Sequence, residues 1–143
     1  MITGGPSVGE QFSGLKLDHL LFIGSNRVAK KVAAQAAKNL VPTTLELGGK
    51  SPTIIGTNAN MALAAERILF SKTLNAGQIC LSPDYIFVKK DQERNLISEL
   101  QKAYSKFFPE PNSHNQTSMV NKHHLKRMNS YLLDATKKGA KVE

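Results

Sequence analysis

Cysteine and tryptophan are the scarcest residues here: the 143 residues include one cysteine, Cys80, and no tryptophan. A single cysteine excludes an internal disulfide framework and suits a reducing compartment, so we expect an intracellular protein. The longest apolar runs, such as HLLFIG at 19–24, are far too short to span a bilayer. The opening MITGGPSVGEQ shows neither the basic lead nor the apolar stretch of a signal peptide.

Acidic and aromatic residues are also few, and this bears on the partners to expect. Lys and Arg number 19 against 11 Asp and Glu, giving a formal net charge of +8, while aromatics make up only 6%. Sites for single-stranded nucleic acid interleave aromatic and basic side chains, and the basic clusters here show no such pattern. A solvated basic surface therefore explains the charge better than a nucleic-acid site does.

What the chain does contain is an alternation of short apolar runs with helical periodicity. The pattern predicts strands at 19–24, 43–48, 52–56 and 84–90. Between and after them it predicts helices at 25–40, 60–75, 91–107 and 121–137, with a loop at 108–118. This order indicates an α/β fold with mostly parallel strands.

Local signals set the expected helix ends. Ser25 and Asp91 are the expected N-caps of the first and third helices. The first helix should carry Leu40 on its apolar face and stop at Pro42, and the last should end at Gly139. Its apolar positions are Leu125, Met128, Leu132 and Ala135.

The length suits one domain with a sizeable core and is too short for two complete ones. The chain closes on KVE at 141–143, which resembles the opening of a further strand. We therefore expect an internal segment of a longer protein.

Gly24 and Ser25 lie where a predicted strand leads into a helix. The free N–H groups of a helix start and its positive dipole end suit a phosphate group. An ordinary capped helix explains the same two residues, so this signal alone leaves both interpretations open.

Glu46 lies in LELGGKSP, where alternation places it on the face of the strand opposite Leu45 and Leu47. It is either a solvated strand residue or a carboxylate that faces a site. The glycine pair at 48–49 weakens a strand and favours a turn or the close approach of a ligand.

Cys80 lies in NAGQICLSPDY, a connection with a glycine before it and a proline after it. Most free cysteines are buried and inert. A nucleophilic thiolate instead needs exposure and nearby N–H groups, which a turn supplies.

Taken together, the Glu46 and Cys80 segments favour the functional interpretation of both residues. Cys80 follows Glu46 by 34 positions, and LELGGKSP followed by NAGQIC at this spacing closely resembles the two signature segments of the aldehyde dehydrogenase superfamily. CLSPDYIFV is most similar to the class 3 branch, which includes fatty-aldehyde dehydrogenases. TGG at 3–5 and DHLLFIGSNRVAKKV at 18–32 also resemble cofactor-domain segments of that branch.

The resemblance implies an incomplete aldehyde dehydrogenase-like fold. Residues 1–46 would form the C-terminal part of the Rossmann-type NAD(P)-binding domain. Residues 47–143 would form the N-terminal part of the α/β catalytic domain.

The resemblance also implies NAD-dependent oxidation of an aldehyde, with NADP as an alternative cofactor, on a medium- or long-chain fatty aldehyde. Cys80 would be the nucleophile and form a thiohemiacetal and then a thioester, which Glu46 would hydrolyse as general base. Gly24, Ser25, Val28 and Leu47 would bind the cofactor. Ile79 and Leu81 would touch the substrate. No metal site is expected, because the adjacent His123 and His124 diverge on a helix and His114 has no evident partner.

The resemblance implies that the full-length protein is a homodimer. We expect it in the cytoplasm or on intracellular membranes. Membrane association would depend on a C-terminal segment that is not part of this sequence. Because the resemblance places further active-site elements upstream and downstream, we expect the isolated chain to be weakly active or inactive. The alternatives are a truncated, non-enzymatic product that keeps only an interaction surface, and a basic nucleic-acid-binding module.

Overall fold

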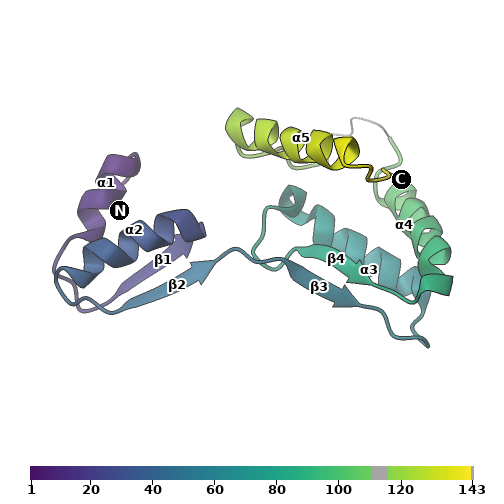
Figure 1. Ribbon diagram of the computed structural model, residues 1–143, viewed down its shortest axis with the longest axis horizontal. Coiled ribbons are helices and arrows are strands. Elements are labelled where there is room, and N and C mark those ends of the chain that lie inside the picture. The colour runs from purple at the N-terminus through teal and green to yellow at the C-terminus, as the bar shows by residue number, and fades with distance from the viewer. Residues whose placement is uncertain (111–115, 143) are drawn as a thin grey trace. The chain divides into compact units, whose positions relative to one another are not determined.

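The computed structural model describes residues 1–110 and 116–142, which divide into two compact units, Met1–Gly49 and Lys50–Glu143. The loop expected at 108–118 falls in part on 111–115, so that part and His114 lie outside the described residues. Among the described residues, no helix is both long and apolar enough to cross a membrane. Figure 1 labels the elements of each unit.

The unit Met1–Gly49 is built around one β-α-β motif. Strand β1 (Leu20–Gly24), helix α2 (Asn26–Ala37) and strand β2 (Thr43–Leu47) follow in order, and β1 pairs with β2 in parallel. The amphipathic α2 buries its apolar side against β1 in a cluster of Leu20, Val32, Ala36 and Val41, with Leu17 and Phe22 packed alongside.

Helix α1 (Pro6–Ser13) was not expected from the sequence. Pro6 occupies its first turn, where the missing N–H costs nothing and the fixed φ suits a helix. The helix is only eight residues long and contains Gly9, so its pattern was too short to reveal it.

The two ends of α2 were predicted with different success. Ser25 caps the helix as expected, since its hydroxyl accepts a hydrogen bond from the Val28 N–H at 3.3 Å. The prediction that Pro42 stops the helix, with Leu40 on its apolar face, was wrong. The helix ends at Ala37, and Leu40 adopts φ 56° with its side chain 90% exposed.

A hydrogen-bond pattern accounts for this early stop. The Val41 N–H donates to the Ala36 carbonyl and the Leu40 N–H to the Ala37 carbonyl, each at 3.1 Å, which is the Schellman arrangement. The turn places Val41 in the apolar cluster, and the Pro42 carbonyl accepts the Leu20 N–H at 3.0 Å as the strands begin to pair.

The unit Lys50–Glu143 repeats the β-α-β order. Strand β3 (Ser51–Ile54), helix α3 (Met61–Thr73), the 3-10 turn η1 (Leu74–Gly77) and strand β4 (Pro83–Phe87) follow in order, and β3 pairs with β4 in parallel. Asn60 caps α3 by accepting the Leu63 N–H at 3.1 Å. Ile55, Met61, Ala65 and Leu96 form the buried cluster.

Helix α4 (Glu93–Phe107) packs against α3 and contributes Leu96 to the cluster. Two expectations near its start were wrong. The strand predicted to 90 ends at Phe87, and Asp91 is not the N-cap, because it lies in the 3-10 turn η2 (Lys90–Gln92). Its carboxylate instead pairs with Lys89 at 3.2 Å.

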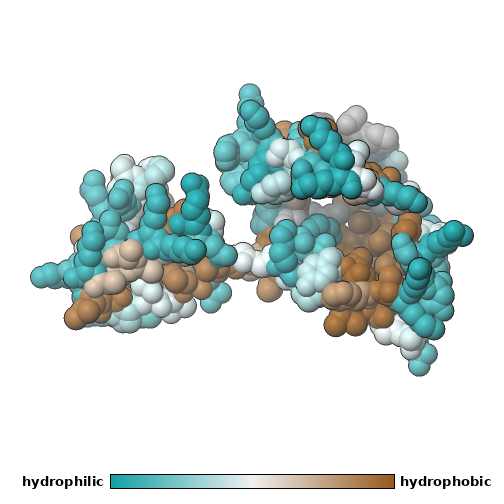
Figure 2. Space-filling view, in the orientation of Figure 1, coloured by the Kyte–Doolittle hydropathy of each residue, from teal (hydrophilic) through white to brown (hydrophobic). Residues whose placement is uncertain are grey.

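Helix α5 (Lys122–Lys137) begins at the Asn121 cap and ends before Gly139, as predicted for that glycine. None of its residues is buried, and its leucines Leu125, Leu132 and Leu133 are about half exposed. Its apolar face is therefore largely uncovered in the described chain. Figure 2 shows apolar surface over the α3 and β4 region of the same unit.

Both strand pairs are parallel and each encloses a helix, which confirms the α/β prediction for the described residues.

Candidate active site

The predicted cofactor residues and Glu46 gather at one end of the β1–β2 pair. Gly24 is the register partner of Leu47, and Ile23 is the partner of Glu46. Alternation therefore puts Glu46 on the Ile23 face of the sheet, away from Leu45 and Leu47. These residues lie at the carboxyl ends of two parallel strands, the edge where open α/β sheets bind ligands.

Gly24 and Ser25 carry the chain from β1 into α2. A Cβ added at Gly24 would lie 2.6 Å from the Phe22 ring, so glycine here has a packing reason of its own. The first turn of α2 holds Arg27 and no acidic residue, which suits an anionic ligand. Val28 is partly exposed next to them, and Leu47 is half-buried.

Cys80 lies in a turn and is exposed. The buried, inert cysteine considered for the sequence therefore does not describe this chain. Ile79 before it is half-buried and Leu81 after it is 78% exposed. No hydrogen bond to another described residue uses the Cys80 backbone N–H.

The chain reaches Cys80 through an unusual backbone. Asn75, Ala76 and Gly77 have φ of 51°, 55° and 73°, three left-handed residues in succession. Non-glycine residues rarely adopt this region, and such strain concentrates at functional sites. A Cβ at Gly77 would lie 3.1 Å from the Lys72 carbonyl oxygen. Both the left-handed φ and this close contact therefore favour glycine at position 77.

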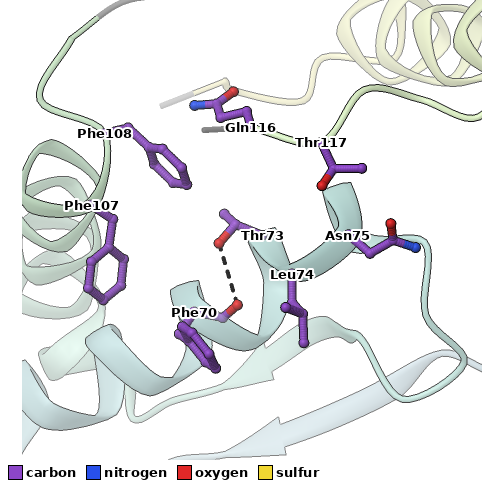
Figure 3. A pocket seen from close by; sticks show the side chains of 8 residues that line it. All are labelled: Phe70, Thr73, Leu74, Asn75, Phe107, Phe108, Gln116 and Thr117. Carbon is purple, nitrogen blue, oxygen red and sulfur yellow. Dashed lines mark hydrogen bonds between the residues drawn. The ribbon is translucent and has the colours of Figure 1, made fainter. Parts of the chain in front are cut away.

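A cavity of about 300 Å³ borders the same turn. Figure 3 shows aromatic rings from the ends of α3 and α4 around it, with Leu74 and Asn75 of η1. The lining residues are Phe70, Thr73, Leu74, Asn75, Phe107, Phe108, Gln116 and Thr117. Three phenylalanines and a leucine make most of this wall apolar.

Lys50, which follows the glycine pair, bonds Asp84 at 2.8 Å and ties the starts of β3 and β4 together. This ion pair gives Lys50 a structural contact at the surface. Among residues 1–110 and 116–142, no three His, Cys, Asp or Glu side chains are grouped to hold a metal.

The structure thus brings the predicted residues into two groups. Gly24, Ser25, Val28, Glu46 and Leu47 belong to Met1–Gly49, whereas Ile79, Cys80 and Leu81 belong to Lys50–Glu143. The pairing of Glu46 with Cys80 stays a prediction. The sequence did not predict the three left-handed residues Asn75–Gly77, the aromatic cavity or the hydrogen bonds of the Gln78 side chain. The adjacent phenylalanines at 107–108 were the one sequence signal for the cavity.

The structure therefore presents an α/β chain with an exposed cysteine that follows a strained turn. The model of the aldehyde dehydrogenase family matches residues 1–143. The chain belongs to the aldehyde dehydrogenase family, which confirms the resemblance drawn from the sequence.

Two curated relatives illustrate the match. The "Probable coniferyl aldehyde dehydrogenase" of Caulobacter vibrioides is 49% identical over 99% of this chain and 30% of its own length. "Aldehyde dehydrogenase family 3 member B3" of Mus musculus is 37% identical over 92% of this chain and 28% of its own length, which supports the class 3 likeness. The chain therefore spans about 30% of the curated relatives it matches.

Solved structures agree on the fold. A substrate-bound AldH of Staphylococcus aureus matches with a TM-score of 0.90 and 40% identity over 95% of this chain and 30% of its own. A Pseudomonas syringae aldehyde dehydrogenase C with NAD+ and octanal matches with a TM-score of 0.86 and 25% identity over 96% and 29%. The predicted aldehyde dehydrogenase-like fold is confirmed.

Proposed function

We propose that the whole protein carrying this chain oxidises an aldehyde to the carboxylic acid with NAD, or with NADP in its place. The observation that carries the proposal is Cys80, the sole cysteine, displayed on a strained turn in a chain of this family. In this proposal the Cys80 sulfur attacks the aldehyde carbon and forms a tetrahedral thiohemiacetal. The Cys80 N–H, unused by other described residues, is free to donate to the oxyanion.

Glu46 is the proposed general base for the second half of the reaction. Once hydride has left the thiohemiacetal, the acyl group remains on Cys80 as a thioester. A carboxylate that takes a proton from water lets the hydroxide attack that thioester and release the acid. Glu46 is exposed at a strand end, which supports this role, because a general base must be reached by water.

The proposed cofactor residues suit a dinucleotide. Gly24 and Ser25 precede an α2 N-terminus with a positive dipole end and Arg27 in its first turn, which favours a pyrophosphate. In this proposal Val28 would lie beside the adenine, and Leu47 would place its backbone carbonyl near the nicotinamide amide. Bound NAD would supply the hydride acceptor.

For the substrate we propose an apolar aldehyde, such as a medium- or long-chain fatty aldehyde. Ile79 and Leu81 flank the nucleophile, and the cavity beside the turn is lined by Phe70, Leu74 and Phe107 among others. Names of the related proteins point the same way: coniferyl aldehyde for one relative and octanal in one neighbour's structure. A homodimer remains our proposal for the assembly of the whole protein.

A chimera tests the activity directly. The matching segment of the Caulobacter vibrioides relative is replaced by this chain, and NADH formation is measured with coniferyl aldehyde and octanal. We expect turnover that Cys80→Ala abolishes. Glu46→Gln should slow the steady state by about 10²-fold or more while leaving a first-turnover burst of NADH, because only thioester hydrolysis is impaired.

The unmodified relative and a chimera with Gln101→Met, at an exposed α4 position, are the controls. A folded chimera that binds NAD but keeps full turnover with Cys80→Ala would contradict the proposal.

A further inference from the structure

Gln78 makes the densest set of side-chain hydrogen bonds around the Cys80 turn. Its amide nitrogen donates to the Asn75 carbonyl at 2.9 Å and to the Ser118 carbonyl at 3.3 Å. Its amide oxygen accepts the Val120 N–H at 2.9 Å. One side chain therefore joins the turn to a segment 40 residues later, just ahead of α5.

The backbone of the turn adds to this link. The Gln78 N–H donates to the Asn75 carbonyl at 3.1 Å, and the Asn75 side-chain amide donates to the Gln78 carbonyl at 3.3 Å. Asn75 and Gln78 are thus bonded three times across the left-handed residues between them. Strained backbone persists only where its surroundings hold it, and these bonds are what holds it here.

We propose that Gln78 is a positioning residue that fixes the left-handed turn Asn75–Gly77 against Ser118–Val120 and thereby sets where the Cys80 sulfur is presented. Both functional groups of the amide are needed. The nitrogen satisfies two carbonyls and the oxygen satisfies one N–H, so neither a carboxylate nor an apolar side chain of the same length replaces it.

The catalytic meaning of this inference rests on the proposed function of Cys80, but the geometric claim does not. Misplacing a nucleophile by about 1 Å costs on the order of 10²-fold in rate. A device that fixes the nucleophile is therefore expected to affect turnover rather than substrate affinity. The test below uses neither aldehyde nor cofactor. Its outcome therefore does not depend on whether the whole protein is an active aldehyde dehydrogenase.

The experiment uses the full 143-residue chain, in which Cys80 is the only thiol. A trifluoromethyl thiol reagent places one fluorine label on Cys80, and fluorine NMR reports how many environments the label samples. The wild-type chain should give one main line. Gln78→Met should give several lines or a broad one, together with at least tenfold faster hydrogen exchange of the Val120 amide, because the bonded oxygen is gone. Gln101→Met, a glutamine exposed on α4, should match the wild type.

Gln78→Glu separates positioning from simple loss of folding. The ionised carboxyl still accepts from Val120 but faces the Asn75 and Ser118 carbonyls without a donor. As the pH falls past its usual pKa of about 4.3, it gains an O–H that can donate to one of them. The spectrum of this variant should approach that of the wild type at the same pH as the pH falls, and a variant that had simply lost its fold would show no such recovery.

Unchanged lines and unchanged Val120 exchange in Gln78→Met would overturn the proposal. If Gln78→Met also loses amide protection in α3 and α4, the pH series decides: recovery supports the inference, and a Gln78→Glu spectrum that stays different at every pH refutes it.

Discussion

Gly77 combines two independent constraints at the residue scale. Its φ of 73° lies in the left-handed region, and a Cβ would stand 3.1 Å from the Lys72 carbonyl oxygen. Its neighbours Asn75 and Ala76 already carry side chains in the left-handed region. A third such residue would add to strain that the turn already holds.

We therefore expect Gly77→Ala to lower the free energy of unfolding by about 1 kcal/mol. The left-handed conformation costs alanine roughly 1–2 kcal/mol, and the smaller entropy of the unfolded alanine chain offsets about 0.5–1 kcal/mol of this. Urea unfolding followed by tyrosine fluorescence measures the change. Gly56→Ala is the control, since a Cβ at Gly56 meets nothing within 4 Å and its φ is not left-handed. Equal midpoints for the two variants would contradict the prediction.

At the scale of the elements, the helix ends show which features could be predicted from the local sequence. The hydroxyl of Ser25 and the flexibility of Gly139 act within one turn of their own position, so both roles could be predicted from the letters. The end of α2 could not, because it depends on Val41 reaching an apolar cluster that includes Leu20 of another element. The same holds for Gln78, whose partners at 118 and 120 are brought to it only by the fold.

Two Schellman turns among the described residues have different residue types at the left-handed position. At the end of α5 the left-handed position is Gly139, with the Ala140 N–H bonded to the Ala135 carbonyl at 3.0 Å. At the end of α2 the equivalent position is Leu40. Leucine bears a conformational cost there that glycine avoids.

Leu40→Gly should therefore stabilise the unit Met1–Gly49 by up to about 1 kcal/mol. Relief of the left-handed strain outweighs the added backbone entropy of glycine in the unfolded chain, and a side chain that is 90% exposed has little burial to lose. Slower hydrogen exchange of the α2 amides is the readout. Leu40→Ala, which keeps a Cβ and so keeps the strain, is the matched control. A Leu40→Gly variant that exchanges faster than Leu40→Ala would contradict the prediction, because the backbone entropy of glycine would then outweigh the relief of left-handed strain.

At the scale of the whole molecule, both units leave apolar side chains exposed. Leu21 and Ile23 project from the β1 face away from α2 and are 58% and 74% exposed, and α5 buries none of its residues. Surfaces of this kind are usually covered in a native assembly. This supports our proposal that the 143 residues turn over aldehyde weakly or not at all by themselves.

The two units each have an apolar cluster of their own, one around Val32 and one around Leu96. We therefore expect a core substitution to destabilise mainly the unit that contains it. Val32→Ala should cost about 1–3 kcal/mol and speed hydrogen exchange of the α2 amides, whereas Leu96→Ala should cost about 2–5 kcal/mol in the other unit.

Tyrosine fluorescence separates these effects without any label. Tyr85, Tyr104 and Tyr131 all lie in Lys50–Glu143, and the chain has no tryptophan, so the signal reports that unit alone. Leu96→Ala should shift the tyrosine midpoint in urea, and Val32→Ala should leave it within error of the wild type. If Val32→Ala moves the tyrosine midpoint as far as Leu96→Ala does, the two clusters unfold as one cooperative body.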